Sequence, residues 1–170
     1  MPRRLLRDRQ IVVDEWRYVA EAASDAGAPL SAPLIVTFDQ WQREPDTWLA
    51  RGSRLGVVLS PAHKVEQLVP DLKRFALIAA EFPSLSEGRG YSQARLLRER
   101  WNFKGELRAT GQVRRDQLFF MARCGFNSFE LPDADIDDAH TAFTTFSAAY
   151  QPSNDLGLAL KLPRDIPASA

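Results

Sequence analysis

Short apolar runs alternate with helical patterns through the middle of this chain, and no other feature limits its fold as narrowly. The runs that can form strands are residues 34–38, 55–59, 75–82, 106–110 and 128–131. Strands separated by helices favour parallel pairing, because the chain must return across the sheet before the next strand begins. We therefore predict an α/β fold of about four βα units with mostly parallel strands, in a sheet that is either open or half-barrel-like, as in part of a TIM barrel.

The segments between these runs predict helices at residues 46–51, 64–74, 92–101, 114–124 and 135–150. Gly125 follows the fourth of them, and a glycine in the left-handed conformation commonly ends a helix. Near the N-terminus, residues 11–13 and 16–19 are rich in β-forming side chains on either side of Asp14 and Glu15. They predict an N-terminal hairpin at the edge of the sheet.

The length of the chain predicts one domain with a short tail. Its 170 residues, of which 45% are hydrophobic, suffice to bury one core without disulfides or metal. We assign residues 1–150 to a single α/β domain. Residues 151–170 contain Pro152, Pro163 and Pro167 and are predicted to form an extended C-terminal tail.

Signals for membranes and metals are missing from the sequence. No stretch reaches the roughly 20 apolar residues of a membrane span, and the basic start lacks the apolar core of a secretory signal. These features predict a cytoplasmic protein that does not bind a membrane. Cys124 is the only cysteine, and His63 and His140 are the only histidines, too few for a Cys/His metal site or an iron–sulfur cluster. We expect no metal and no cofactor.

Charge is unevenly distributed, although the formal net charge is zero. Residues 89–123 carry eight arginines and Lys104 against three acidic residues, so nine minus three leaves six excess positive charges. The zero net charge argues against general electrostatic binding of nucleic acid, whereas the clustering of positive charge is the more informative feature and fits a small anionic ligand. The segment that follows is acidic, and a homo-oligomer that pairs the two segments stays an open alternative.

The loop after the third apolar run is the most distinctive motif, with the sequence PSLSEGRGYS over residues 83–92. Its glycines permit a tight turn, Ser92 can cap the next helix, and the free amides of a helix N-terminus attract anions, more so beside arginines. The predicted anion-binding residues are Gly88, Arg89, Gly90, Tyr91, Ser92 and Arg95. Alternatively, both arginines pair with nearby glutamates and the glycines serve only the turn.

Arg108 lies in the middle of the predicted strand 106–110, where a buried charge is costly unless it is paired. Glu81 on the preceding strand and Glu130 on the following one are the expected partners. The three residues predict a buried polar row on one face of the sheet. This row is either an ion pair that fixes the strand register or an arginine–glutamate site for an anionic ligand.

Other polar and aromatic residues give weaker indications. His63 follows the second apolar run with Ser60 close by, which makes it a weak acid/base candidate beside the more ordinary role of a surface histidine. Cys124 ends a predicted helix, where the helix dipole disfavours a thiolate, so we interpret it as a core residue. The neighbouring residues interpreted as core are Phe119, Phe120, Met121 and Phe126.

Three motifs carry a resemblance to a known family. They read FPSLSEGRGYSQARLLRER from Phe82, GELRATGQVRRDQ from Gly105 and RCGFNSFEL from Arg123. With these motifs the chain resembles the bacterial domain-of-unknown-function 934 family, and the preceding strand and helix fit the same pattern. Glu87 stands where that family usually has an aspartate before Gly-Arg-Gly.

Members of that family are commonly labelled as oxidoreductases of sulfite reduction, which implies a place in sulfur assimilation and cysteine biosynthesis. Reducing sulfite to sulfide needs a haem-type centre and an iron–sulfur cluster, which this chain cannot ligate. The resemblance therefore implies an accessory protein that acts with sulfite reductase, or with another sulfur-assimilation protein, and binds a small anion or anionic ligand. The alternatives are a small cofactor-independent enzyme acting on an anionic substrate and a purely structural oligomeric partner.

Overall fold

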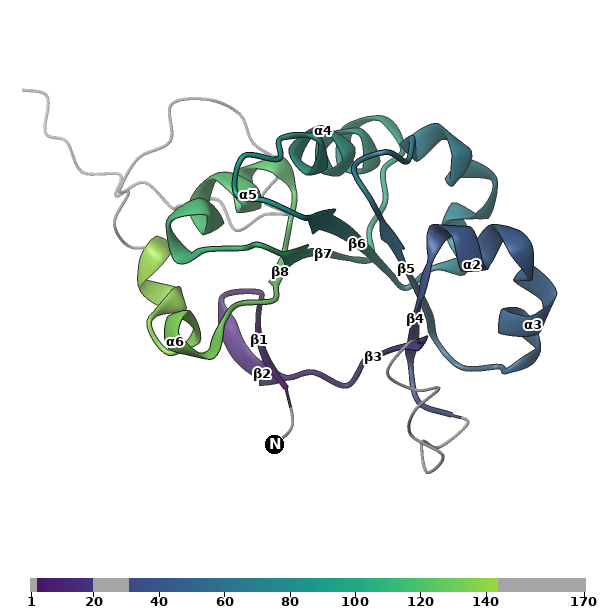
Figure 1. The fold of residues 1–170 in the computed structure, drawn as a ribbon, viewed down its shortest axis with the longest axis horizontal. Helices are drawn as coiled ribbons and strands as arrows, with labels where there is room; N and C mark the ends of the chain where they lie inside the picture. Colours follow the sequence, from purple (N-terminus) through teal and green to yellow (C-terminus); the bar gives the residue numbers. More distant parts are fainter. Residues whose placement is uncertain (1–2, 20–30, 144–170) are drawn as a thin grey trace, which may run out of the picture.

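The computed structural model describes residues 3–19 and 31–143, within which the chain forms one curled sheet in the shape of a half-barrel (Figure 1). The strand order is β2-β1-β8-β7-β6-β5-β4-β3. The strands are β1 (Arg4–Arg7), β2 (Gln10–Val13), β3 (Arg17–Tyr18), β4 (Leu34–Thr37), β5 (Leu55–Leu59), β6 (Leu77–Phe82), β7 (Glu106–Gly111) and β8 (Ser128–Phe129). Each of the predicted central strands is present, because each apolar run is buried over most of its length.

The sheet is mixed rather than mostly parallel, which corrects the predicted pairing. From β3 to β8 each pairing is parallel, whereas β1 pairs antiparallel with both β8 and β2. The hairpin of β1 and β2 joins the sheet at β8, where Leu6 lies opposite Phe129. Antiparallel strands can be joined by a short turn without a helix between them, so the alternation of strands and helices could not predict this pairing.

An N-terminal hairpin is present, but only one of its strands, β2, corresponds to a predicted strand, residues 11–13. It joins β1 to β2 through a two-residue turn at Asp8 and Arg9, whose φ angles of 49° and 65° are both positive. This type of turn matches the twist of paired strands. The other predicted strand, β3, pairs with β4 instead, because Asp14 does not turn a hairpin but forms ion pairs with Arg3 and Arg108.

The helices follow the strands, with several boundaries shifted from those predicted. The α-helices are α2 (Phe38–Arg43), α3 (Pro45–Ala50), α4 (Arg89–Arg95), α5 (Leu118–Cys124) and α6 (Asp133–Ile136). The shorter segments are the 3-10 turns η1 (Val65–Gln67), η2 (Val69–Arg74), η4 (Arg115–Gln117) and η5 (Ala139–Phe143), and the π-helical η3 (Leu96–Arg100). α5 ends at Gly125, as predicted, with a left-handed φ of 116°.

Two predicted helices need correction. The predicted helix 64–74 is a pair of 3-10 turns, because Pro70 lacks the N–H that an α-helix would use at this point. The predicted helix 92–101 begins earlier, at Arg89, and continues into η3. The end of the predicted helix 135–150 and the tail 151–170 lie outside the described residues. None of the helices in the described ranges is long and apolar enough to cross a membrane.

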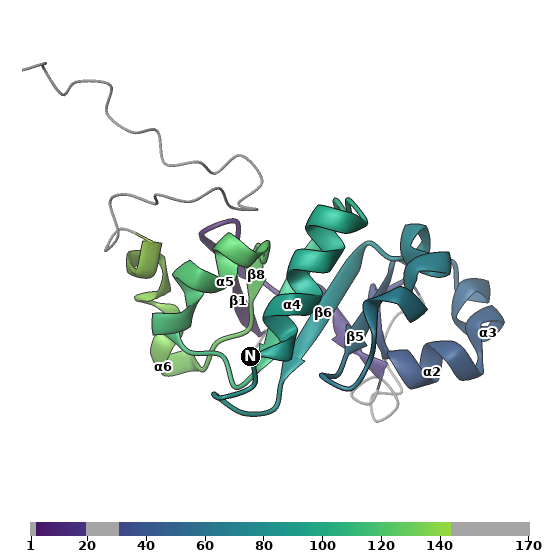
Figure 2. The same cartoon turned by 90° about the horizontal axis from the view of Figure 1, so that it is seen from above.

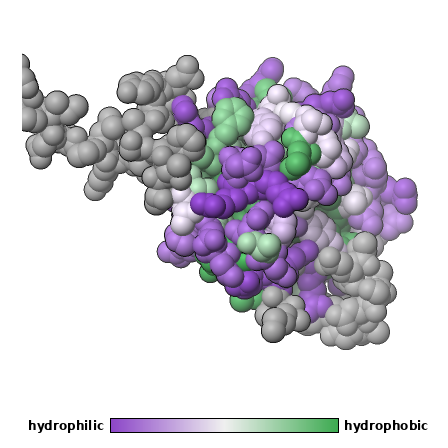
Figure 3. Space-filling view, turned by 60° about the vertical axis from the view of Figure 1, so that its left-hand side comes forward, coloured by the Kyte–Doolittle hydropathy of each residue, from purple (hydrophilic) through white to green (hydrophobic). Residues whose placement is uncertain are grey.

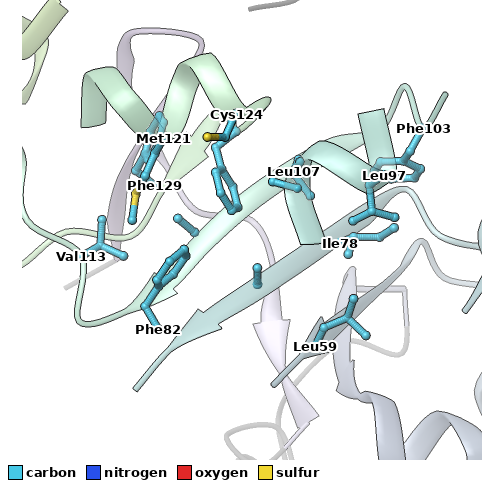
Figure 4. Packing of buried hydrophobic residues seen from close by; sticks show 14 of the residues in the cluster. Leu59, Ile78, Phe82, Leu97, Phe103, Leu107, Val113, Met121, Cys124 and Phe129 are labelled. Atoms are coloured by element: carbon cyan, nitrogen blue, oxygen red, sulfur yellow. The ribbon is translucent and has the colours of Figure 1, made fainter. Parts of the chain in front are cut away.

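The main core lies between the convex face of the sheet and helices α2, α4 and α5 (Figure 1), with α4 packed along β6 (Figure 2). Figure 4 shows Ile78 and Leu107 of the sheet in this core together with Leu97 and Cys124 from the helices. Cys124 is fully buried, which confirms that it is a core residue. The same interpretation of Phe120 is wrong, since 51% of this residue is exposed.

The concave face of the sheet is partly apolar and partly charged. Its apolar part is a small cluster of Trp16, Ile35, Leu77 and Ala79. Arg108 projects from the same face, because Ala79 lies opposite it in the register and both have the same orientation in the pleat. Because Arg108 lies beside this apolar cluster, its charge must be balanced by carboxylates on the same face.

Candidate functional site

Arg108 is fully buried on β7 and is held by three carboxylates. Its guanidinium donates to both oxygens of Asp14 at 3.0 Å, to Glu106 at 2.8 and 3.1 Å, and to Glu130 at 3.1 Å. These bonds use every N–H donor of an arginine side chain. Because no donor is left for a ligand, the geometry favours a structural ion-pair network, here called the Arg108 network, over an anion site.

Further side chains balance the charge of the Arg108 network. Arg3 donates to Asp14 at 2.9 and 3.1 Å, and an Arg7 nitrogen lies 3.5 Å from Glu106. Together with Arg108, these arginines match the negative charges of the carboxylates one to one. A buried network of this kind is tolerated because each charge has an opposite charge and hydrogen bonds.

Two groups in the network keep their protons more tightly than usual. Burial lowers the pKa of Arg108, but the charges of Glu106, Asp14 and Glu130 outweigh it and raise that pKa above its ordinary value. The Tyr18 hydroxyl donates to Glu130 at 2.7 Å, and burial together with the charge of Glu130 raises the pKa of Tyr18 above its ordinary value of 10.0. Neither group exchanges its proton near neutral pH, so neither suits acid/base work there.

The predicted polar row of Glu81, Arg108 and Glu130 is formed only in part. Arg108 and Glu130 are in contact, but Glu81 lies opposite Thr110 in the register, two positions beyond Arg108. That offset is roughly 6–7 Å along a strand. Glu81 is half-buried, and its side chain makes no hydrogen bond or ion pair with another described residue.

The sequence interpretation missed two partners of Arg108. Glu106 stands two residues before Arg108, hence on the same face of the same strand, so the strand period was a sufficient signal. Asp14 lies 94 residues away in the sequence, and nothing in the local pattern pointed to it.

The predicted anion-binding loop already holds a carboxylate at its helix N-terminus. α4 begins at Arg89 with Gly88 as its N-cap, and the backbone N–H of Arg89 donates to Glu87 at 2.9 Å. The Arg89 side chain also lies 3.7 Å from Glu87, so the alternative arginine–glutamate pair is formed. Ser92 is exposed inside α4 and does not cap it.

Arg95 and Arg89 do not converge on one ligand. They are six residues apart on the helix, which separates them by about 9 Å along the axis and about 120° around it. Arg95 is exposed, and its interaction with the Cys124 sulfur raises the pKa of Arg95. The anion cradle that the sequence suggested is therefore not assembled by α4 alone.

Gly90 and Tyr91 have packing roles. A Cβ at Gly90 would lie 2.5 Å from the ring of Phe82, so only glycine lets α4 approach β6 this closely. Tyr91 packs against Phe82 and Phe120, with ring centroids 5.2 Å apart in each pair. Phe120 is thereby held in place while half of it faces solvent.

An apolar and basic surface results, here called the α4–α5 surface and defined by Leu85, Arg89, Tyr91 and Phe120. Leu85 is 54% exposed, Phe120 51%, and the side chain of Arg89 69%. The face turned forward in Figure 3 is mostly hydrophilic, with small separate hydrophobic areas. Among the described residues, the other exposed large hydrophobic side chains are Ile11, Val13 and Leu49.

His63 forms a polar cluster with Ser60 and Asp39 where β5 and β4 end. Nδ1 of His63 accepts the backbone N–H of Ser60 at 3.0 Å and lies 3.1 Å from the Ser60 hydroxyl, while Nε2 lies 3.3 Å from Asp39. An Nδ1 that accepts a backbone N–H carries no proton, so the ring proton is on Nε2 and faces Asp39. To act as a base, Nδ1 would have to give up its bond to Ser60, which favours the ordinary structural role.

Potential metal ligands do not gather at this edge of the sheet. Among residues 3–19 and 31–143, no group of three or more His, Cys, Asp or Glu side chains is placed to hold a metal ion. The His63 loop is fixed by Gln93 instead, whose side-chain amide donates to the carbonyls of Ser60 and His63 at 2.9 Å.

Comparison with known proteins identifies the family. Residues 56–160 match the family described as bacterial protein of unknown function (DUF934). No curated protein matches the chain. The matched region begins in β5, contains the three motifs at residues 82–100, 105–117 and 123–131, and covers more than half of the sequence. The chain therefore belongs to the DUF934 family.

Proposed function

We propose that this protein is an accessory protein of assimilatory sulfite or sulfate reduction that docks on sulfite reductase through its α4–α5 surface. The pathway in this proposal rests on the resemblance carried by the three motifs. The mode of action rests on the exposure of Phe120 and its neighbours, which is the observation that carries it.

Phe120 has the properties of an interface anchor. It is 51% exposed, yet its ring is fixed by Tyr91 at a centroid distance of 5.2 Å, so little conformational entropy remains to be lost on binding. Aromatic and arginine side chains are enriched in the energetically dominant part of protein interfaces. Leu85 is a further exposed apolar side chain on the loop that leads into α4, and Arg89 adds a positive charge at the start of that helix.

Charge indicates the kind of partner. The segment 89–123 has six excess positive charges in the sequence, of which Arg98 and Arg108 are buried, and it supplies Arg89, Tyr91 and Phe120 to the surface. An acidic surface on the partner, with an apolar centre that receives Phe120, fits these properties. Arg89 is also the residue best placed to contact a small anion, for which Glu87 competes at 3.7 Å.

A second candidate function is a small cofactor-independent enzyme that acts on an anionic substrate. It is favoured by the cluster of His63, Ser60 and Asp39, which lies at the carboxyl ends of parallel strands, where sites of βα proteins gather. Glu81, at the same edge of the sheet, has no described partner and would be a further acid/base group.

Complementation of a deletion strain separates the two candidates. Deleting the gene should impair growth on sulfate or sulfite as sole sulfur source, and cysteine or sulfide should restore it. Docking predicts that Phe120→Asp fails to complement, whereas His63→Ala and the matched control Leu49→Asp, at another exposed leucine, complement fully. The enzyme candidate predicts the reverse for Phe120→Asp and His63→Ala. Normal growth of the deletion strain on sulfite would remove the pathway assignment.

A further inference from the structure

A pocket of about 560 Å³ opens where β6 and β7 begin, at the opposite end of the sheet from Ser60 and Glu81. Residues from two segments line it, 69–75 before β6 and 101–105 before β7. The volume lies in the range of pockets that hold small molecules. Phe103, one of its walls, lies at the far end of the core from Phe82 in Figure 4.

The walls of the pocket are aromatic and firmly held. Phe75 and Phe103 are nearly buried, while Trp101 and Leu72 are half-buried. The buried Arg98 fixes the second segment, since its guanidinium donates to the carbonyls of Phe103 at 2.6 Å and Gly105 at 3.0 Å. The pocket is therefore formed in advance, which lowers the entropic cost of binding.

Close packing adds to this rigidity. A Cβ at Gly105 would lie 2.6 Å from the carbonyl oxygen of Ala76, so the two strands enter the sheet in contact. Asn102 is held at a positive φ of 53°, a conformation that asparagine tolerates better than most residues. The close contact at Gly105 and the conformation of Asn102 restrict the backbone on both sides of Phe103, which forms a wall of the pocket.

The opening of the pocket is positively charged. Lys73 and Lys104 both line it, are exposed, and form no ion pair with a described residue. The chain has only four lysines in all, so two of them meet at this pocket. Among the residues that the structure describes, no acidic side chain lines the pocket.

The nearest carboxylates in the sequence are engaged elsewhere. Asp71 accepts hydrogen bonds from Trp41 at 3.0 Å and from Arg74 at 3.0 Å. Glu106, which directly follows the second segment, is bound to Arg108 on the concave face. Asp71 and Glu106 do not line the pocket, so neither competes with a bound anion for Lys73 and Lys104.

We propose that this pocket binds a small organic anion with an apolar body, in which the aromatic walls hold the body and Lys73 and Lys104 bind the charged head group. A sulfonate or a carboxylate on a ring or branched chain has this chemistry. An ammonium on a flexible stem suits a head group whose position varies, because it acts as a point charge rather than a fixed fork. This site does not depend on the docking proposal, because it lies where β6 and β7 begin, whereas Leu85 and Arg89 of the α4–α5 surface follow the end of β6.

Two dyes that differ in charge test the proposal on the full chain. The anionic dye is 8-anilino-1-naphthalenesulfonate and the neutral one is N-phenyl-1-naphthylamine, and fluorescence titration measures the Kd of each. In Lys73→Met/Lys104→Met, the Kd of the anionic dye should rise by about tenfold or more, while that of the neutral dye changes less than about twofold.

Matched variants locate the effect. Lys64→Met removes another exposed lysine, and Leu49→Asp removes an exposed apolar side chain away from the pocket lining; both should leave the Kd of the anionic dye unchanged. Circular dichroism and thermal unfolding check that each variant is folded. An unchanged Kd of the anionic dye in the double lysine variant would overturn the proposal, and so would an equal loss of both dyes.

Discussion

At the scale of single residues, Arg108 determines what the concave face of the sheet can be. Its donors are all engaged, and three carboxylates depend on its charge. Removing only the arginine would leave these carboxylates together without their central cation. Such a change destabilises the fold far more than replacing the whole network with apolar side chains would.

Arg108→Met should therefore lower the free energy of unfolding by about 3–5 kcal/mol. Arg108→Lys should lower the free energy of unfolding by less, because an ammonium keeps the positive charge. Some loss should remain, because an ammonium lacks the planar guanidinium that contacts three carboxylates. Urea unfolding followed by circular dichroism measures both. A loss below about 1 kcal/mol for Arg108→Met would show that the network is not needed for stability.

Tyr18 gives the same network a dependence on alkaline pH. Its pKa is raised above 10.0 in the folded protein, first by burial and then by Glu130. The folded state thus holds the phenol proton more tightly than the unfolded state, so this contribution is complete below pH 10 and is lost as the pH rises further.

The wild-type free energy of unfolding should consequently fall more steeply above pH 10 than that of Tyr18→Phe, by up to about 1.4 kcal/mol per pH unit. Urea unfolding at a series of pH values from 8 to about 11 measures the two slopes. Tyr91 is present in both proteins and cancels from the comparison. Parallel slopes would mean that Tyr18 loses its proton as easily in the folded state as in the unfolded one.

The sequence revealed part of this residue-scale arrangement and not the rest. That Arg108 needs buried carboxylates followed from its place in a strand, and Glu130 was among those expected. Asp14 could not be foreseen, because the half-barrel must curl before the N-terminal segment reaches β7. Glu81 was assigned wrongly as a partner of Arg108 because the register that places Ala79 opposite it depends on the packed sheet.

At the scale of elements, the apolar runs predicted the central strands and Gly125 predicted the end of α5. The N-terminal hairpin and the antiparallel pairing of β1 depend on contacts between distant parts of the chain. The hairpin was placed around Asp14 because the turn at Asp8 and Arg9 lacks the glycine that usually marks such turns. Apolar spacing in residues 64–74 suggested a helix, but Pro70 limits that segment to 3-10 turns. The two errors have different causes: the hairpin turn carries no local marker, whereas in residues 64–74 the apolar spacing was given more weight than the local marker Pro70.

Gly125 should be indispensable for the end of α5. Its φ is 116°, and a Cβ there would lie 2.4 Å from the Arg98 side chain that also fixes the pocket segment. Gly125→Ala should reduce the free energy of unfolding by about 1–3 kcal/mol. Gly88→Ala is the matched control and should have little effect, because a Cβ there meets nothing within 4 Å. Equal unfolding midpoints in urea would contradict this account.

At the scale of the whole molecule, the half-barrel separates structural charge from surfaces available to other molecules. The concave face carries the Arg108 network, while the convex face is covered by helices whose outer side carries Phe120. A chain built in this way offers a partner the outer side of its helices. The charge excess in residues 89–123 lies largely on these same elements.

The most direct test of the proposed function is the affinity of the purified protein for purified sulfite reductase from the same bacterium, measured by isothermal titration calorimetry. We predict that the wild-type protein binds, that Leu85→Asp/Phe120→Asp binds at least about tenfold more weakly, and that the control Leu49→Asp binds like the wild type. Absence of wild-type binding, or equal affinity of the Leu85→Asp/Phe120→Asp variant, would contradict the proposal that this surface docks on sulfite reductase.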